Sequence, residues 1–226
     1  MKRKRKNSLY LLFLVVVVVC LLYVWRSLKV NNVRCFNKSS YCSKETESAA
    51  ERYIGKSYFD ARNLLSKELS ESIRVKKYRI SFNFPDILFL EVDEREPKVA
   101  AKFAENKYYV FDKEGVSLGA VFNTQLPVIL VYEVPHNEQF SFGMKLANEL
   151  VKYYDAGNLS VDKAGLYAKV SGFDFAFPLY GDIDVILGSL EVILSQLNDI
   201  FQNSTIMSTG KNHKVDLRYK NPVISM

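Results

Sequence analysis

The distribution of apolar and polar positions begins with one continuous apolar stretch, residues 9–25, which contains no charged side chain. Seventeen residues of helix span roughly 25 Å, close to the roughly 30 Å hydrocarbon thickness of a bilayer. Aromatic side chains lie near both ends, at Tyr10, Tyr23 and Trp25, and such rings favour the headgroup level. A buried core helix is disfavoured because the stretch has no polar face. A cleaved signal peptide is disfavoured because no small-residue cleavage site follows Cys20.

Residues 9–25 are therefore predicted to form a transmembrane helix. Five consecutive cations, Lys2–Lys6, precede the stretch, and dense positive charge favours the cytoplasmic side. Residues 1–8 are then a cytoplasmic basic tail, and residues 26–226 lie outside the cytoplasm. The expected location is the cell membrane, crossed once.

The spacing of apolar residues changes twice within residues 26–97, and these changes predict the order strand, helix, helix, strand, strand. Helices need apolar residues at a spacing of three to four, and strands need alternation. Pro97 closes this first domain. The predicted strands are 26–35, 75–82 and 87–94, and the predicted helices are 44–54, capped by Ser43, and 61–71, capped by Asp60.

Residues 98–226 are predicted to form a second domain dominated by a β-sheet. Glycine and proline separate its short apolar runs. The fold class is thus α+β: a transmembrane helix, a small β-α-α-β-β domain, and a mixed domain with one main sheet. The predicted strands are 107–111, 116–118, 127–131, 164–170, 173–177, 183–187, 214–219 and 222–224, and the predicted helices are 143–154 and a segment beginning at Gly188.

The net charge of +6 is unevenly distributed along the chain. Residues 1–44 hold ten of the 31 Lys and Arg residues, and all 25 Asp and Glu residues follow Lys44. The folded part therefore carries a small excess of negative charge. A nucleic-acid-binding domain would be basic, so the composition predicts no nucleic-acid partner.

Two of the three cysteines, Cys35 and Cys42, are close in sequence. A disulfide loop is favoured on the extracytoplasmic side, where such bonds persist. A catalytic or metal-binding pair is the alternative, but no histidine or third thiol lies nearby.

The inventory of catalytic residue types is thin. The two histidines, His136 and His213, lie in no metal-ligand spacing, and no nucleophile elbow or phosphate-binding glycine loop occurs. Ser160 and Lys163 have the Ser-x-x-Lys spacing of a peptidase dyad, although they follow a glycine-containing loop. The sequence predicts neither a cofactor nor a metal site, and favours binding over catalysis.

Three acidic residues crowd one predicted strand, namely Glu91, Asp93 and Glu94. Alternation places Glu91 and Asp93 on one face and Glu94 on the other. Solvated strand carboxylates explain this cluster better than an acid–base pair.

Five segments together resemble the FtsQ/DivIB cell-division family. They are Val75–Ala100, Tyr109–Val116, Leu126–Ile129, Leu187-Gly188 and Val215–Tyr219. Each segment is weakly specific alone, and their order and spacing carry the resemblance. It implies a POTRA domain over residues 26–97 and a β-domain over residues 98–226.

The resemblance further implies a non-enzymatic divisome scaffold, a membrane protein of the septum that binds FtsB-like and FtsL-like partners and couples division to septal peptidoglycan synthesis. An FtsK-like protein is a further candidate partner, and no small-molecule substrate is expected. In that family the partner strand adds to the C-terminal edge of the sheet. The partner-binding residues implied here are Arg218, Tyr219, Asn221, Val223 and Ile224.

Three other interpretations stay open from the sequence. The edge strand, Val215–Tyr219, is in the plainest of them only the closing strand of the core. A membrane-anchored envelope peptidase would use Ser160 and Lys163. A POTRA-type secretion chaperone would need tandem POTRA units or a β-barrel, and the sequence shows neither.

Overall fold

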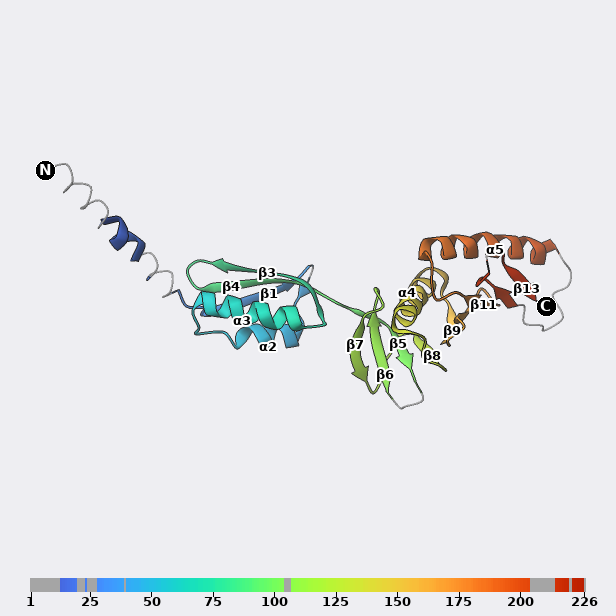
Figure 1. The fold of residues 1–226 in the computed structure, drawn as a ribbon, viewed down its shortest axis with the longest axis horizontal. Coiled ribbons are helices and arrows are strands. Elements are labelled where there is room, and N and C mark those ends of the chain that lie inside the picture. Colours follow the sequence, from blue (N-terminus) through green and yellow to red (C-terminus); the bar gives the residue numbers. More distant parts are fainter. Residues whose placement is uncertain are drawn as a thin grey trace. The chain divides into compact units, whose positions relative to one another are not determined.

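The chain folds into two compact units, Met1–Arg95 and Glu96–Met226 (Figure 1). The computed structural model describes residues 13–19, 23, 28–38, 40–103, 107–203, 214–219 and 221–225. The division after Arg95 lies two residues before the domain boundary that the sequence predicts. Each unit has its own hydrophobic core.

The predicted transmembrane helix needs correction. Much of residues 9–25 and the whole basic tail, residues 1–8, lie outside the described residues; residues 13–19 and Tyr23 are described and are helical. Within the described part of the chain, no helix is long and apolar enough to cross a membrane. This finding overturns the predicted transmembrane helix and the single-pass membrane location deduced from it.

The first unit is a four-stranded sheet with two helices on one face (Figure 1). The strand order is β2-β1-β4-β3, with β1 parallel to β4 and the other neighbours antiparallel. Buried side chains of the helices and strands meet between the two layers, including Leu65, Leu69, Leu88 and Leu90. The elements are β1 (Asn32–Asn37), β2 (Ser40–Tyr41), α2 (Lys44–Glu51), α3 (Tyr58–Glu71), β3 (Val75–Asn83) and β4 (Ile87–Glu94).

Serine caps begin both helices of this unit. The Ser43 hydroxyl accepts a hydrogen bond from the Thr46 amide, and the Ser57 hydroxyl accepts one from the Asp60 amide. The second helix therefore starts at Tyr58, and the prediction that Asp60 caps it is wrong. Asp60 lies in the first turn instead, where its carboxylate accepts a hydrogen bond from Ser57 Oγ at 2.6 Å, and where negative charge is favoured by the helix dipole.

The second unit contains a nine-stranded sheet and two long helices. The order is β13-β12-β11-β10-β9-β8-β5-β6-β7. The strands are β5 (Pro97–Lys102), β6 (Tyr108–Asp112), β7 (Ser117–Val121), β8 (Val128–Val131), β9 (Gly157–Val161), β10 (Leu166–Val170), β11 (Phe173–Phe177), β12 (Lys214–Asp216) and β13 (Val223–Ser225), and the helices are α4 (Asn137–Tyr154) and α5 (Ile183–Asn203).

Residues 183–187 are helical, so the strand predicted there is wrong. The Asp182 carboxylate accepts a hydrogen bond from the Asp184 amide at 2.9 Å and begins the helix. From there the buried residues Ile186, Leu190 and Ile193 recur at helical spacing. The apolar run was short enough to fit a strand, and only the following turns reveal the helical period.

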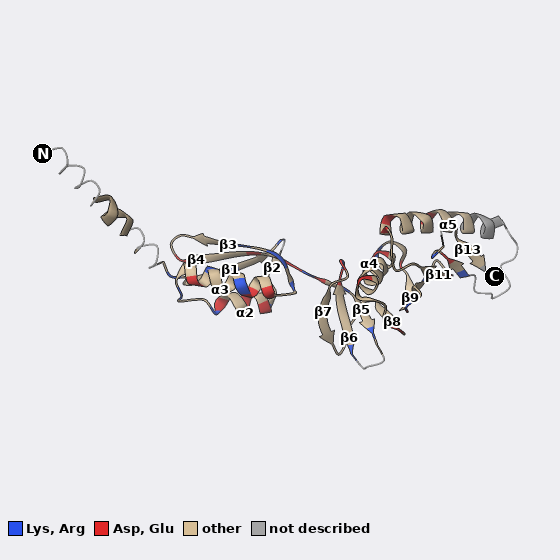
Figure 2. Ribbon diagram, viewed as in Figure 1, with Lys and Arg blue, Asp and Glu red and all other residues tan. Residues whose placement is uncertain are grey.

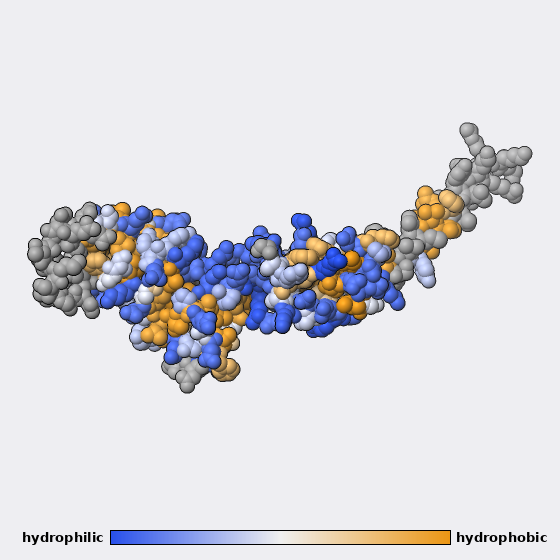
Figure 3. All heavy atoms as spheres, turned by 180° about the vertical axis from the view of Figure 1, so that it is seen from behind, coloured by the Kyte–Doolittle hydropathy of each residue, from blue (hydrophilic) through white to orange (hydrophobic). Residues whose placement is uncertain are grey.

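The last strands of the sheet lie with α5 in one core. Leu190, Leu194 and Leu197 of α5 belong to the same buried cluster as Phe175 and Val215. Figure 2 shows α5 largely free of charged residues along the part that is coloured. Viewed from behind, both units expose apolar residues among hydrophilic ones (Figure 3). The core under α5 holds the C-terminal strands, where the candidate site lies.

Candidate partner-binding edge

The residues that the resemblance assigns to partner binding come together in one C-terminal hairpin, β12–β13. β12 runs parallel to β11, and β13 returns antiparallel to β12 with Val215 opposite Ile224 and Asp216 opposite Val223. Arg218, Tyr219 and Asn221 lie in the connection. Because β13 is terminal in the described sheet, this hairpin forms the edge. The strand predicted over residues 214–219 ends at Asp216 in the structure, and β13 of the same chain pairs with it.

The register decides which face each residue of the hairpin occupies. Val215 is fully buried in the core cluster that also contains α5 side chains, and directly paired residues share a face. Ile224 therefore lies on the helix-covered face, and Val223 lies on the opposite face with Asp216. Val223 and Ile224 are about half exposed, at 51% and 48%. A strand that paired with β13 would place one side chain beside Ile224 and another beside Val223, on the two faces of the sheet.

Val215, Leu217 and Tyr219 alternate with Asp216 and Arg218 in the sequence, a pattern that predicts one strand with all three facing inward. Only the first two are buried, whereas Tyr219 is 62% exposed. The physical reason is that β12 ends at Asp216, so the alternation of a strand no longer fixes the direction of Tyr219.

Arg218 is held by Asp216 on the open face of the sheet. Asp216 Oδ1 accepts from the Arg218 amide at 3.0 Å and from Arg218 Nε at 2.9 Å. The guanidinium also donates to the Tyr167 hydroxyl at 3.4 Å and lies over that ring at 5.9 Å from its centroid. The hydrogen bond from Arg218 lowers the pKa of Asp216, and Asp216 in turn raises the pKa of Arg218. The guanidinium is consequently a fixed cation beside the hairpin.

Gly165 makes room for this arrangement. A Cβ at that position would lie 2.7 Å from the Phe177 carbonyl oxygen and 3.1 Å from Arg218 Cδ. The aliphatic part of Arg218 therefore passes against bare backbone at the start of β10. Any larger residue at position 165 requires the sheet or Arg218 to move.

Asp216, Tyr167 and Gly165 are the members of this site that the sequence-based prediction missed. Asp216 and Arg218 are two residues apart, and that spacing is a readable signal, because it places both on one side of an extended chain. Tyr167 and Gly165 are about fifty residues away in sequence and join through β-sheet pairing alone. No local pattern points to them. Burial raises the pKa of Tyr167.

The Ser160 and Lys163 pair does not form a dyad. Lys163 is exposed and forms an ion pair with Glu133 at 3.2 Å, and no hydrogen bond joins its amino group to Ser160. Ser160 lies on β9, opposite Tyr167. Of the two histidines, His136 precedes α4 without a side-chain capping bond, and His213 lies outside the described residues.

The three acidic residues of β4 are engaged in structural bonds. Asp93 forms an ion pair with Lys38 at 2.8 Å, and Glu91 approaches Arg79 at 3.8 Å. Glu94 faces the helices and accepts hydrogen bonds from Ser43. Among the residues with described positions, no group of three or more His, Cys, Asp or Glu could hold a metal ion.

Cys35 and Cys42 are joined in the structure, with 1.95 Å between their sulfur atoms. Cys35 lies on β1 and Cys42 directly follows β2, and both are buried in the first unit. The bond therefore closes the β1–β2 hairpin beneath the sheet.

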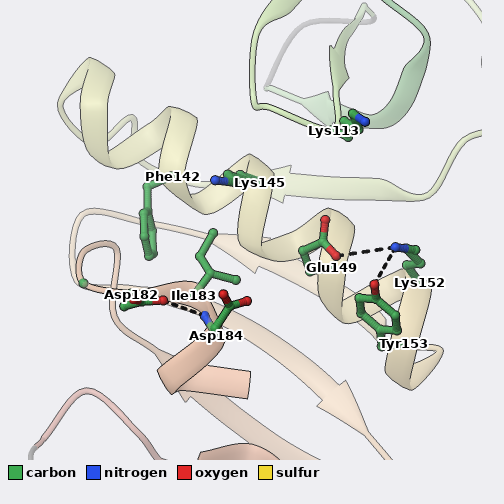
Figure 4. Close-up of a pocket in the computed structure, with 10 residues that line it drawn as sticks. Lys113, Phe142, Lys145, Glu149, Lys152, Tyr153, Asp182, Ile183 and Asp184 are labelled. Atoms are coloured by element: carbon green, nitrogen blue, oxygen red, sulfur yellow. Dashed lines mark hydrogen bonds and ion pairs between the residues drawn. The ribbon is translucent and has the colours of Figure 1, made fainter. Parts of the chain in front are cut away.

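A hollow of about 640 Å³ lies along α4 (Figure 4). Lys152 points toward both Glu149 and Tyr153, and donates to the Tyr153 hydroxyl at 2.6 Å, which raises the pKa of Lys152. Asp182 caps α5. Lys113 and Lys145 also line the hollow. None of the residues that the resemblance assigns to partner binding lies in it.

No known family model matches the chain, and no curated protein matches it. The β12–β13 hairpin and the resembling sequence segments are therefore the two features that bear on function.

Proposed function

We propose that this chain is a non-enzymatic scaffold protein of the cell-division machinery, and that its β12–β13 hairpin binds an FtsB-like partner strand. The observation that carries the proposal is the terminal position of β13, a three-residue strand with two half-exposed apolar side chains. An added strand gains affinity from backbone hydrogen bonds and specificity from side-chain contacts.

The distribution of the resembling segments supports this proposal. Val75–Ala100 covers β3, β4 and the start of β5; Tyr109–Val116 covers β6 and its turn; Val215–Tyr219 covers β12 and the connection after it. A small unit with two helices on a sheet precedes a larger unit with one long sheet, as that family's domain order implies.

The edge is short and charged, and these properties favour pairing with one specific partner over indiscriminate strand pairing. Long, flat, apolar edges aggregate, whereas short or charged edges resist it. Here Arg218 supplies a fixed cation, Tyr219 an exposed ring, and Pro222 a backbone position that cannot donate a hydrogen bond.

The test is binding of an FtsB-like partner by the double variant Tyr219→Ala/Val223→Asp, measured by calorimetric titration. Both side chains are exposed, but the new carboxylate at position 223 faces Asp216, and like charges opposite each other weaken a sheet. A small drop in melting temperature is therefore expected, while affinity falls at least tenfold, about 1.4 kcal/mol, in the folded variant. The matched control is Tyr180→Ala/Val185→Asp, which changes an aromatic and a valine of similar exposure elsewhere in the second unit.

A folded double variant with wild-type affinity would place the partner site elsewhere and leave the hairpin as a purely structural edge. Loss of affinity in the control as well would mean that surface change in general, and not this edge, is responsible.

A further inference from the structure

The sheet of the first unit has one face without helices, and its side chains form a second surface with its own chemistry. Cys35 is buried with the helices, so its neighbours Arg34 and Phe36 point to the open face. Pairing carries this face across the sheet, because Arg34 lies opposite Phe89 and Phe36 lies opposite Glu91. The same face continues onto β3 with Arg79 and Lys77.

Three aromatic side chains, Phe36, Tyr41 and Phe89, form a continuous row on this face, here called the aromatic shelf. The ring centroids of Phe36 and Phe89 are 5.1 Å apart, and those of Phe36 and Tyr41 are 6.0 Å apart, with both pairs stacked. Tyr41 is 81% exposed. Phe36 is exposed and Phe89 is half-buried. A contiguous apolar patch rimmed by polar residues is typical of a binding surface.

The shelf borders a hollow of about 630 Å³. Its lining includes both phenylalanines of the shelf and charged side chains from β3 and β4. Small-ligand sites fall in the range of roughly 300–1,000 Å³ and combine aromatic walls with a few polar groups. The volume of this hollow therefore suits a small ligand built of a few rings, and not a folded protein.

The charges around the shelf do not cancel. Four cations, Arg34, Lys38, Lys77 and Arg79, surround two carboxylates, Glu91 and Asp93. Lys38 pairs with Asp93, and Arg79 approaches Glu91. Among the described residues, Arg34 and Lys77 have no carboxylate within ion-pair distance. The excess positive charge complements an anionic ligand.

We propose that the aromatic shelf and its charged rim bind an acidic oligosaccharide. A sugar ring has an apolar C–H face, which can lie flat on an aromatic ring, and a rim of hydroxyls. Each hydroxyl both donates and accepts hydrogen bonds, so a rim with carboxylates and ammonium groups serves it in both directions. A carboxylate on the sugar pairs with Arg34 or Lys77.

A single-stranded nucleic acid is the competing anionic ligand, since bases also stack on aromatic platforms. Glu91 and Asp93 lie on β4 beside Phe89, within the hollow. A phosphate backbone that crossed the shelf would meet these carboxylates, whereas sugar hydroxyls donate to them. The carboxylates therefore favour the saccharide.

The disulfide positions the shelf. Cys35 immediately precedes Phe36, Cys42 immediately follows Tyr41, and their Cα atoms are 5.5 Å apart. The bond thus fixes the β1–β2 hairpin directly beneath the stacked Phe36–Tyr41 pair. Reduction frees Tyr41 to move away from Phe36, so the proposal predicts weaker saccharide binding by the reduced protein.

The experiment is calorimetric titration of the full chain with tetragalacturonate, a tetramer of an acidic sugar, and with the neutral tetramer of N-acetylglucosamine. We expect the acidic tetramer to bind at least tenfold more tightly. Tyr41→Ala should lower that affinity about tenfold, since one aromatic contact and its buried area contribute about 1.4 kcal/mol. Phe122→Ala, an aromatic of similar exposure in the second unit, is the matched control and should bind as wild type. Lys77→Gln should weaken the acidic tetramer and leave the neutral one unchanged.

Three results would overturn the proposal: no measurable binding of tetragalacturonate, equal binding of the two tetramers, or an equal loss in Phe122→Ala. Tighter binding of a short oligothymidylate than of the acidic tetramer, lost in Tyr41→Ala, would assign the shelf to nucleic acid instead. All variants replace exposed residues, and an unchanged melting curve confirms that each is folded.

Discussion

Gly165 and Arg218 depend on each other although they lie far apart in the chain. A Cβ on residue 165 would meet the Phe177 carbonyl oxygen at 2.7 Å, a distance that real Cβ atoms do not tolerate. We predict that Gly165→Ala destabilises the second unit by about 1–3 kcal/mol and weakens partner binding by displacing Arg218. Urea denaturation measures the first effect. Gly188→Ala is the control, since nothing lies within 4 Å of its added Cβ; an equal loss there would refute the steric explanation.

Asp216 makes stability pH-dependent with a definite sign. Its pKa is lowered below the ordinary value of 3.8, chiefly by the hydrogen bond from Arg218. A lowered pKa stabilises the folded state above the ordinary value, and this contribution is lost as pH falls through the lowered one. Asp216→Asn should therefore cost about 1–2 kcal/mol at pH 7 and show a smaller further loss at pH 3 than wild type.

Denaturation curves at pH 7 and pH 3 measure this difference. Glu138→Gln, which changes an exposed carboxyl in the first turn of α4, is the control and should follow the wild-type pH dependence. Identical pH dependence in wild type and Asp216→Asn would show that the Asp216–Arg218 pair contributes no net stability.

Helix α2 is anchored at its first residues by a carboxylate from the end of β4. Glu94 accepts hydrogen bonds from the Ser43 amide at 3.1 Å and the Ser43 hydroxyl at 2.8 Å, and a further one from the Thr46 hydroxyl. We predict that Glu94→Ala destabilises the first unit by about 1–3 kcal/mol, because it leaves these donors unsatisfied. Glu91→Ala, which removes only an exposed ion pair, should change stability by less than about 1 kcal/mol. Thermal melts of both variants compare the two.

The closed β1–β2 hairpin gives a second prediction about an element. Cys35 and Cys42 enclose a short loop, so in the chain-entropy description the bond stabilises the first unit by roughly 2–3 kcal/mol. Mass spectrometry of the non-reduced protein should recover the two cysteines in one linked peptide. Two free thiols in protein prepared without reductant would contradict the bond.

Local signals predicted the elements of the first unit better than those of the second. In residues 44–94 the cap at Ser43 and the alternation of Leu88, Leu90 and Val92 correspond to α2 and β4. Position 183 was misread because a short apolar run fits both a strand and a helix. The bond between Ser43 and Glu94 could not be predicted from the sequence, because the Glu94 carboxylate that accepts it lies about fifty residues from Ser43.

The whole molecule shows the same division between local and distant information. The two units were readable from the change in pattern near Pro97. The order of the nine strands could not be predicted from the sequence, since the neighbouring strands β11 and β12 are separated in the chain by the whole of α5. The Asp216–Arg218 spacing was visible, whereas Tyr167 became part of the site only through that pairing. The apolar stretch at residues 9–25 predicted a membrane span, whereas the described residues contain no helix long and apolar enough to cross a membrane.

The two units have separate cores, and this separation predicts how the full chain unfolds. Leu65 is fully buried in the first core, and Phe175 is almost fully buried in the second. Leu65→Ala should destabilise the first unit by about 2–5 kcal/mol, and Phe175→Ala should destabilise the second by about 3–5 kcal/mol. Hydrogen exchange followed by mass spectrometry measures each unit in the intact protein. Leu65→Ala should accelerate exchange in β3, β4 and α3 and leave β10 and β11 unchanged, with the converse for Phe175→Ala. Acceleration across both units by either single substitution would mean that the two cores unfold as one cooperative structure.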